Sequence, residues 1–336
     1  MKLAHFIDLV TDASRRDLTI NSIAMESDIP NSPDGIRQYI DPYNGRADIQ
    51  AKILRHTSDA FSEDPVRVLR IARFRARLGP EWTVAAETKV LIYNIAKSGG
   101  LDELTPERIW KEMSQALLEP FPRLFFDTLL ECDALYAVFP EIYKLLTALE
   151  SHRWHPEGNA YKHTMLCLTQ AAEFKMDLEA MFAVLVHDFG KGLTPFHRLP
   201  KHYGHDVNGV ALVESFANRL TVPSKIRDRS MKSTRYHMLM HKLDTIKANT
   251  YVKMFNDMQV LNDPRAVSIL YSVGICDERG RLGSENNSIE HLWVLMQKFK
   301  AYCSVKFIDV FPNGETDANK IQSKLQEARI KAVDNA

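Results

Sequence analysis

A histidine and aspartate pair in the middle of the chain has the side chains that a metal centre needs. His187 and Asp188 follow an apolar run, residues 181–186, and Gly190 and Gly192 come next. The run predicts a buried helix that ends at this pair. Adjacent helical residues point about 100° apart, so both side chains can reach one ion off the helix axis. Mixed nitrogen and oxygen ligands suit a divalent transition metal, or magnesium with open water positions. A water held on such an ion has a lowered pKa and can attack a phosphoester.

More candidate ligands lie in the same part of the sequence. Nine of the twelve histidines fall between His152 and His241, and such a cluster is where a metal site is sought first. The upstream His163 and the downstream Asp277 could complete a ligand set. His237 and His241 are four residues apart and could bind a second metal, although a solvated helical face is the simpler interpretation. For the central pair, a hydrogen-bonded core histidine is the alternative.

A second set of residues could recognise a nucleotide. Asp64, Arg67 and Arg70 are three residues apart and would line one stripe of a helix. A carboxylate beside a guanidinium can accept a hydrogen bond from the exocyclic amine of cytosine or adenine while donating to the neighbouring ring nitrogen. Guanine and uracil present the opposite order, so this pair would select C and A. In the simpler alternative, Asp64 caps the helix, Arg67 pairs with it and the arginines that follow are solvated.

Arginine is concentrated in the same stretch. Five arginines lie between residues 67 and 77, and residues 65–80 contain no acidic side chain. Arginine is favoured over lysine where planar, bidentate contacts are made. The run therefore favours a surface that contacts nucleotide phosphates or an RNA backbone.

Helices must carry most of these side chains. Residues 1–58 read as short strands and turns, whereas apolar residues recur at helical spacing from Asp64 onward. Prolines near residue 150 predict a domain boundary, and the polar stretch after Phe307 predicts a surface helix or a frayed tail. Two pairs are typical of helix starts: Asp64-Pro65 and Thr105-Pro106.

Three motifs together resemble the bacterial class II tRNA nucleotidyltransferases, the CCA-adding enzymes and their poly(A) polymerase relatives. In chain order they are Arg15-Arg16-Asp17 with Asn21, Ile40-Asp41-Pro42-Tyr43-Asn44-Gly45, and Glu63-Asp64-x-x-Arg67-x-x-Arg70. Residues 104–108 and the His187-Asp188 segment also fit the subgroup that carries an appended HD hydrolase domain. The resemblance covers nearly the whole chain.

The resemblance implies a role for each nucleotide-binding candidate. The ribose and triphosphate of the incoming nucleotide would be contacted by three residues of the first motif: Arg16, Asp17 and Asn21. The base edge would be read by Asp64 and Arg67, with Arg70 in support. The implied partners are ATP, CTP and tRNA.

The HD segment implies a metal-dependent phosphohydrolase with 2′,3′-cyclic phosphodiesterase, 2′-nucleotidase and phosphatase activities. The implied cofactor is a divalent transition metal such as Ni²⁺, bound by four residues of which the central pair is catalytic: His163, His187, Asp188 and Asp277. Lys191 and His205 are further candidates for contacts to phosphate or to the ligands. Lys191 could equally interact with the helix terminus.

One feature of the family is missing from these residues. Members hold two Mg²⁺ ions for nucleotidyl transfer with an Asp-x-Asp pair on a strand, and this chain has no Asp-x-Asp. We therefore expect an N-terminally truncated relative that selects nucleotides but cannot add CCA alone. The alternatives are a noncatalytic protein that binds tRNA ends, half of a split enzyme whose missing palm half is a separate chain, and a degenerate gene product.

The expected fold is mainly α. It combines a remnant of the nucleotidyltransferase α/β palm with a helical neck and body and an all-helical HD domain. The expected domains are a partial palm at 1–58, a nucleotide- and RNA-binding neck and body at 59–148, the HD domain at 149–295 and a C-terminal tail at 296–336.

Composition excludes several other classes of protein. The 336 residues include 43 basic and 43 acidic side chains, so a globally polybasic nucleic-acid binder is excluded. The four cysteines form no C-x-x-C pair, which argues against a zinc ribbon or a disulfide scaffold and favours the reducing cytoplasm. The longest apolar run, residues 180–186, is far shorter than the ~20 residues of a membrane span. No signal peptide and no membrane partner are expected.

Overall fold

The first part of the chain joins short strands to helices. The computed structural model describes residues 9–25 and 39–336, so the partial palm predicted for 1–58 is described only outside 1–8 and 26–38. Contacts within the chain divide it into two compact units, 1–143 and 144–336; the four-part division given above stays a prediction. The described strands of unit 1 form an antiparallel pair, β1 (Ala24–Met25) with β2 (Tyr39–Ile40), and a parallel pair, β3 (Ile53–Leu54) with β4 (Thr83–Val84).

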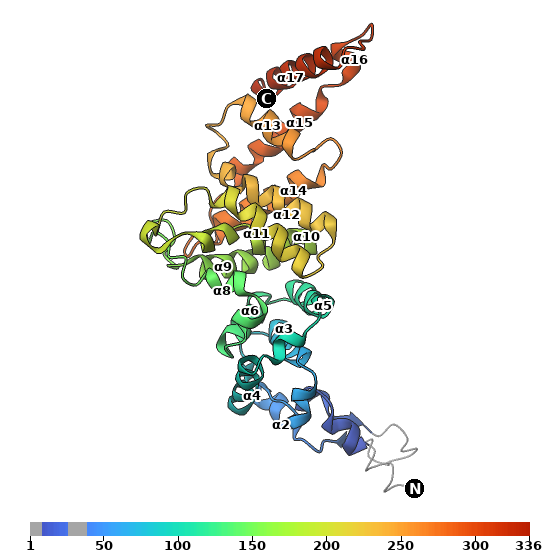
Figure 1. The fold of residues 1–336 in the computed structure, drawn as a ribbon, viewed down its shortest axis with the longest axis vertical. Helices are drawn as coiled ribbons and strands as arrows, with labels where there is room; N and C mark the ends of the chain where they lie inside the picture. Colours follow the sequence, from blue (N-terminus) through green and yellow to red (C-terminus); the bar gives the residue numbers. More distant parts are fainter. Residues whose placement is uncertain (1–8, 26–38) are drawn as a thin grey trace. The chain divides into compact units, whose positions relative to one another are not determined.

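Helix α3 (Val66–Leu78) is the central element of unit 1 (Figure 1). It starts directly after Asp64-Pro65, and the Asp64 carboxylate accepts a hydrogen bond from the backbone N–H of Val66 at 3.2 Å. Its apolar face packs on α5 and α6. The other described α-helices of this part are α2 (Gly45–Ala51), α4 (Ala86–Lys97), α5 (Pro106–Leu117), α6 (Arg123–Glu131), α7 (Leu135–Val138) and α8 (Pro140–Lys144), with 3-10 helices η1 (Thr19–Asn21), η2 (Asp59–Glu63) and η3 (Gly100–Glu103).

Unit 2 is built around helix α10 (Leu178–Val186), which is buried from Ala180 onward. Every residue from Ala180 to Val186 is at most 2% exposed, because α10 packs against three other helices of the unit. The helix ends where the apolar run ends, as predicted, and His187 is its C-cap residue. The helices around it are α9 (Ala160–Glu173), α11 (His205–Arg219), α12 (Ser224–Tyr236) and α14 (Arg265–Arg279), with 3-10 helices η4 (Phe189–Leu193), η5 (Phe196–Arg198) and η6 (His237–Lys242).

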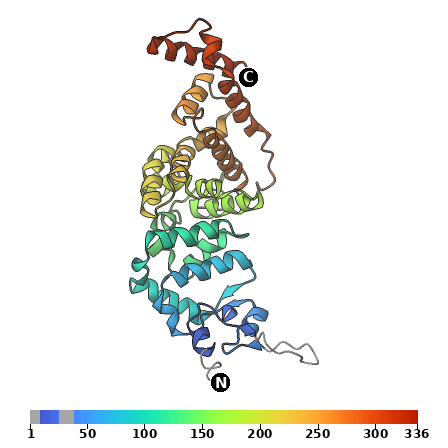
Figure 2. The same cartoon turned by 90° about the vertical axis from the view of Figure 1, so that its right-hand side faces the viewer.

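The end of the chain packs into a second apolar core of unit 2. This core includes Tyr251, Leu295 and Tyr302. The polar stretch predicted to form a surface helix or to fray is helical (Figure 2). Its Val333 is fully buried in the same core. The elements here are α13 (Ala248–Asp257), η7 (Glu290–Leu292), α15 (Trp293–Ser304), α16 (Phe307–Val310) and α17 (Ala318–Asp334).

The predicted mainly α fold is confirmed. Strands of the described residues are confined to the two short pairs of unit 1. All four cysteines are free thiols, as the absence of a paired spacing predicts. None of the helices in the described ranges has both the length and the apolar character of a bilayer span.

Candidate nucleotide pocket and metal centre

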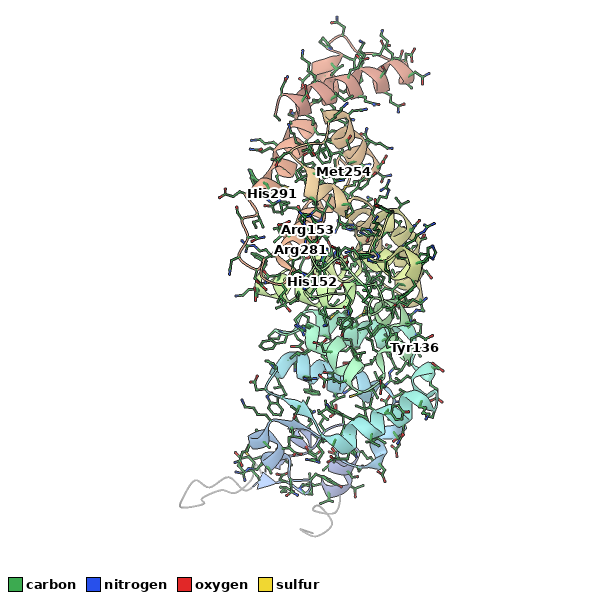
Figure 3. The ribbon with its side chains drawn as sticks, turned by 90° about the vertical axis from the view of Figure 1, so that its left-hand side faces the viewer. Tyr136, His152, Arg153, Met254, Arg281 and His291 are labelled. Carbon is green, nitrogen blue, oxygen red and sulfur yellow. The ribbon has the colours of Figure 1, made fainter. Side chains whose placement is uncertain are left out.

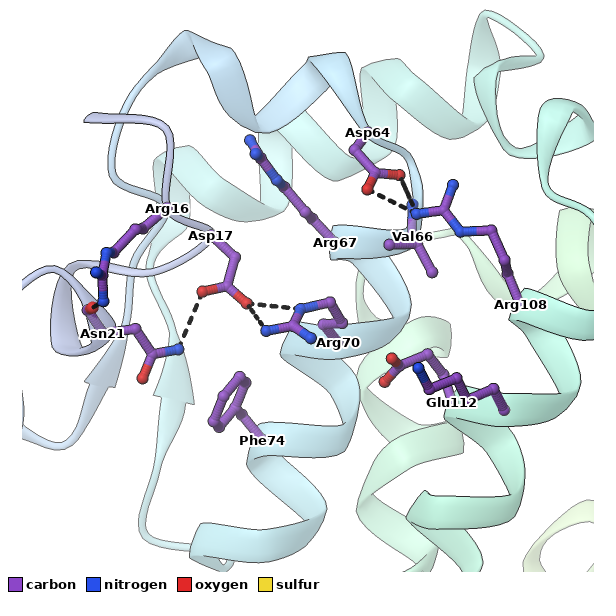
Figure 4. A pocket seen from close by; sticks show the side chains of 11 residues that line it. Arg16, Asp17, Asn21, Asp64, Val66, Arg67, Arg70, Phe74, Arg108 and Glu112 are labelled. Atoms are coloured by element: carbon purple, nitrogen blue, oxygen red, sulfur yellow. Dashed lines mark hydrogen bonds and ion pairs between the residues drawn. The ribbon is translucent and has the colours of Figure 1, made fainter. Parts of the chain in front are cut away.

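The six predicted nucleotide-binding residues line one pocket of unit 1 (Figure 4). Its volume is about 700 Å³. The chain around η1 supplies one wall, and α3 with the residue before it supplies another. The structure thus brings together Arg16, Asp17, Asn21, Asp64, Arg67 and Arg70, while the role of each stays a prediction.

Asp17 connects the two walls of the pocket. Its side chain is buried, with Oδ2 2.7 Å from both Nε and Nη2 of Arg70, and its Oδ1 accepts a hydrogen bond from Asn21 Nδ2 at 3.0 Å. These contacts are drawn in Figure 4. The first motif is therefore held on α3 by a charge-assisted pair, which is stronger than a neutral hydrogen bond.

Asp64 and Arg67 do not pair with each other. Arg108 Nη2 of α5 lies 2.8 and 2.7 Å from the two oxygens of Asp64, and Arg67 donates to the backbone carbonyls of Ala60 and Arg15. The alternative in which Arg67 pairs with Asp64 is therefore wrong. A base-reading pair is not preassembled, because a third residue occupies the carboxylate.

The arginine run does not form a continuous phosphate surface. Three of its members pair with glutamates outside α3: Arg73 with Glu112 at 2.6 Å, Arg75 with Glu131 at 2.7 Å and Arg77 with Glu119 at 2.8 Å. The prediction is wrong for Arg73 and Arg75, which are buried in these pairs, and stays a prediction for Arg77, whose side chain is 52% exposed. Only Arg67 and Arg70 of the run line the pocket.

Helix α5 lines this pocket as well. Arg108, Lys111 and Glu112 of α5 lie at its wall together with Phe74 of α3. The motifs that predicted the pocket include none of these residues. Their spacing of three and four residues puts them on one helical face, which is the signal that could have found them.

The four predicted metal ligands of unit 2 meet at one buried point. His163 of α9 is fully buried, and His187, Asp188 and Asp277 are at most 4% exposed. Nε2 of His163 lies 3.2 Å from Oδ1 of Asp277 and 3.8 Å from Oδ2 of Asp188. Nε2 of His187 lies 3.3 Å from the same Oδ2. The structure therefore brings α9, α10 and α14 together at this set.

Two more histidines join the cluster. Nε2 of His205 and of His237 lie 3.3 and 3.4 Å from Oδ1 of Asp188 and 3.1 Å from each other. His237 is 1% exposed, so its interpretation as part of a solvated face is wrong. His241 is partly exposed, and its Nε2 lies 2.8 Å from Oδ2 of Asp277.

Backbone carbonyls determine the tautomer of three rings. In each ring Nδ1 lies 2.7 Å from a carbonyl oxygen three residues earlier: His187 with Val184, His205 with His202 and His237 with Thr234. A carbonyl oxygen can only accept, so each Nδ1 must carry the proton. The Nε2 of a neutral ring then presents a lone pair to the cluster.

The cluster has acceptors that the protein does not satisfy. Nε2 of His187 and both oxygens of Asp188 are buried and have no partner with hydrogen-bond geometry, although the ammonium of Lys191 lies 2.6 Å from Oδ2 of Asp188. Burial by itself would raise the pKa of Asp188, but Lys191 and His187 hold it well below its ordinary value. Buried, ionised acceptors without donors fit a divalent cation. Asp188, His205 and His237 each offer one possible metal-ligating atom, and these atoms lie within 4.8 Å of one another.

A cavity of about 750 Å³ opens onto this cluster. Asp188 and Asp277 line it, whereas His163 and His187 do not. Arg281, labelled in Figure 3, also lines the cavity, and its buried Nε has no hydrogen-bonding partner. Sequence reasoning had assigned no role to Arg281, although it lies four residues after Asp277.

Three family models match the chain in succession. Residues 2–55 match the poly A polymerase head domain, residues 83–146 the probable RNA and SrmB-binding site of polymerase A, and residues 160–266 the HD domain. The chain joins a poly A polymerase head and RNA-binding segment to an HD domain. Both the nucleotidyltransferase and the HD families are enzymatic. His163, His187 and Asp188 lie inside the HD match, and Asp277 lies beyond it.

Solved structures of similar fold cover nearly all of this chain. A CCA-adding enzyme with ATP is 18% identical at a TM-score of 0.61, over 97% of this chain and 68% of that chain. The Thermotoga maritima CCA-adding enzyme complexed with tRNA is 18% identical at 0.61, over 98% and 70%. A tRNA-processing enzyme in an apo form is 18% identical at 0.53, over 97% and 73%. The resemblance to tRNA nucleotidyltransferases with an HD domain is thereby confirmed in domain content and fold.

Proposed function

We propose that unit 2 is a metal-dependent phosphohydrolase that acts on phosphoesters at RNA ends, with 2′,3′-cyclic phosphodiesterase, 2′-nucleotidase and phosphatase activities. One observation carries the proposal. Oδ1 of Asp188 and Nε2 of His205 and His237 face one another at 3.1–3.4 Å, and both ring Nδ1 protons are already donated to carbonyls. Acceptors so arranged repel one another unless a cation or an extra proton lies between them.

Two neighbouring cation sites fit these donors. One would be held by His163, His187, Asp188 and Asp277, and a second by Asp188 with His205 and His237. Imidazole with carboxylate suits a divalent transition metal such as Ni²⁺ or Mn²⁺. When bound, the metal lowers the pKa of a coordinated water and polarises the phosphoester.

Arg281 is the better candidate for the substrate phosphate. The ammonium of Lys191 lies within 2.6 Å of carboxylate oxygens of both Asp188 and Glu150, so its charge is already neutralised and it orients Asp188. Arg281 lines the cavity, and its buried Nε has no hydrogen-bonding partner. Its Nη2 lies 3.5 Å from Oδ1 of Asp277, a longer ion pair than those of Lys191, and a guanidinium can bind two phosphate oxygens at once.

The hydrolase proposal is tested with the double variant His187→Ala, Asp188→Ala. Release of adenosine monophosphate from 2′,3′-cyclic AMP, measured with Ni²⁺ or Mn²⁺, should fall to background. The matched control is Glu173→Gln, an exposed carboxylate at the end of α9 that bonds Gln170 and should keep wild-type turnover. Unchanged turnover in the double variant would remove the site assignment.

For unit 1 we propose selective binding of C and A nucleotides. Asp64 and Arg67 would read the base edge once Arg108 has released Asp64. The ribose and triphosphate would be bound by Arg16, Asp17 and Asn21 of the first motif. Arg70 would orient this motif through its ion pair with Asp17. CTP, ATP and tRNA are the proposed partners, in line with the fold shared with CCA-adding enzymes.

A specific observation favours binding over catalysis in this pocket. Each carboxylate among its described lining residues is already paired with an arginine: Asp17 with Arg70, Asp64 with Arg108 and Glu112 with Arg73. Carboxylates so neutralised are poor ligands for the Mg²⁺ ions of nucleotidyl transfer. A tRNA-end-binding protein, or half of an enzyme completed by a separate chain, is therefore the second candidate.

Two measurements test this part. Calorimetry should show tighter binding of CTP and ATP than of GTP and UTP, and Arg67→Lys should reduce the preference by about tenfold because the planar fork is lost. Equal binding of all four would contradict base selection. Incorporation of labelled CTP into tRNA by the purified chain alone would overturn the binding-only assignment.

A further inference from the structure

His163 differs from the other buried histidines of the cluster in what holds its ring. Its Nδ1 lies 3.1 Å from Oε1 of Glu157, whereas the rings of His187, His205 and His237 are held by backbone carbonyls. A carboxylate accepts, so Nδ1 carries the proton and Nε2 presents its lone pair toward Asp277. Glu157 thus determines which nitrogen of His163 faces the cluster. Because Glu157 acts through its side chain, this contact can be removed by mutation.

Glu157 is itself held from two further directions. It is 7% exposed, and its Oε1 also lies 2.9 Å from Nδ1 of His155. Its Oε2 accepts a hydrogen bond from the backbone N–H of Leu282 at 3.3 Å, just after α14, the helix that carries Asp277. One carboxylate therefore ties the loop before α9 to the end of α14.

The chain leaves Glu157 through a sharp turn. Gly158 has a φ of +93°, a conformation that side chains with a Cβ rarely adopt. Its carbonyl accepts from the backbone N–H of Glu150 at 3.0 Å, which closes the loop. The carboxylate is thereby fixed by the backbone before any ligand binds.

Glu157 accepts from two imidazoles through one oxygen. Its Oε1 lies 2.9 Å from Nδ1 of His155 and 3.1 Å from Nδ1 of His163. His155 also lies 2.8 Å from Oε2 of Glu150. An anionic partner on Nδ1 makes the opposite nitrogen of an imidazole a stronger metal ligand.

We propose that Glu157 is a positioning residue for the metal centre: it holds His163 in the tautomer and orientation that present Nε2 to the cation. This inference rests on the proposed metal site of unit 2 and extends it to a residue that lies outside the ligand set and outside the cavity. Glu157 acts through His163 and contacts neither substrate nor metal.

The first test measures metal affinity, using Co²⁺ alone as the probe on metal-free full-length protein. Glu157→Gln should bind Co²⁺ about 10–100-fold more weakly than the wild type, the range found when partners of metal-ligating histidines are removed. Glu173→Gln is the matched control, with the same charge change in the same unit, and should bind as the wild type does. Wild-type affinity in Glu157→Gln would overturn the proposal.

A second readout reports the tautomer directly. In ¹⁵N-histidine NMR of the metal-free protein, His163 should show a protonated Nδ1 in the wild type and a mixture of tautomers in Glu157→Gln. An unchanged tautomer would overturn the proposal. A smaller number of Co²⁺ ions bound, in place of weaker binding, would also overturn it, because Glu157 would then be a ligand.

A third variant separates positioning from folding. Glu157→Asp keeps the negative charge of the loop but draws the shared acceptor oxygen back from both His155 and His163. It should unfold near the wild-type temperature and still bind Co²⁺ more weakly, and full affinity in this variant would count against positioning. His187→Ala distinguishes the two proposals: if it keeps wild-type Co²⁺ binding the metal site itself is wrong, whereas loss in His187→Ala with none in Glu157→Gln removes only the role of Glu157.

Discussion

In the pocket of unit 1 each aspartate meets an arginine, whereas in unit 2 the aspartates lie among imidazoles. The side chains of Asp64 and Arg108 are 35% and 46% exposed. Those of Asp188 and His205 are 2% and 7% exposed. The first pair is satisfied without a ligand, and the second is a set of acceptors facing one another.

This difference separates two ways of binding a ligand. An exposed ion pair contributes about 0–1 kcal/mol, so a nucleotide that offers equivalent hydrogen bonds can replace Arg108 on Asp64 at small cost. In unit 2, Lys191 pairs with Oδ2 of Asp188, but Oδ1 faces the Nε2 atoms of His205 and His237. These acceptors repel one another until a cation lies between them. Unit 1 is therefore suited to exchange of partners, and unit 2 to tight retention of a metal.

The largest expected effect comes from one isosteric change made in both sites. Asp188→Asn should weaken Co²⁺ binding more than about 100-fold, because it removes a charged ligand and leaves Lys191 without one of its buried partners. Asp64→Asn should leave Co²⁺ binding unchanged and weaken CTP binding by about tenfold. Calorimetry with both ligands on both variants checks this, and a crossed effect would break the comparison.

The second largest effect is the loss of stability when a buried ion pair of unit 1 is broken, compared with an exposed one. Glu112→Gln leaves buried Arg73 with Glu119, 3.7 Å away, as its charged partner, and should lower the free energy of unfolding by up to about 3 kcal/mol. The side chains of Glu112 and Arg73 are only 6% and 9% exposed. Arg108→Gln breaks the exposed pair and should change stability by less than about 1 kcal/mol. Urea unfolding measures both, and equal losses would contradict the distinction.

One histidine in each unit should make stability depend on pH, and the two dependences should be opposite. Burial by itself lowers the pKa of His155, but Glu150 and Glu157 outweigh it and raise the pKa to about 9 from 6.5. Protonated His155 therefore contributes at most about 3 kcal/mol to the free energy of unfolding. This contribution is complete below pH 6.5 and is lost as the pH rises through 9. Burial lowers the pKa of His56, so its contribution is present above pH 6.5 and is lost as the pH falls.

Thermal unfolding at several pH values checks these signs. His155→Gln should differ from the wild type most near pH 6 and least near pH 10. His56→Gln should show the reverse trend, with the difference shrinking in acid. A His155→Gln difference that grew with pH would refute the assignment of charge to the buried loop.

The smallest effect concerns the partner of Asp64. Arg108→Gln frees the carboxylate for the base and should strengthen CTP binding by no more than about fivefold, the equivalent of an exposed ion pair. Lys111 of α5 also lines the pocket. Lys111→Gln removes a positive charge that attracts the negatively charged nucleotide, and should weaken CTP binding. Weaker binding in Arg108→Gln would mean that this arginine contacts the nucleotide.

The local sequence pattern was sufficient to predict two helix ends and some of the residues of each site. The apolar run predicted a buried helix ending at His187 because seven consecutive apolar residues can only be stable inside a core. The Asp64-Pro65 pair predicted the start of α3 because proline suits the first helical turn. Asp64, Arg67 and Arg70 were expected on one stripe because the helical repeat places residues three apart on one face.

Partners of these residues were decided by the tertiary structure. Whether Arg73 meets phosphate or Glu112, whether Asp64 meets Arg67 or Arg108, and whether His237 faces solvent depend on which helix packs alongside. Helical periodicity specifies the face a side chain occupies, but the charge on the opposing helix comes from a distant stretch of sequence. The amino-acid order by itself therefore determined where α3 begins and α10 ends, although α2 formed in a stretch that read as strands and turns. Packing decided which charges are neutralised and which acceptors are left for a metal.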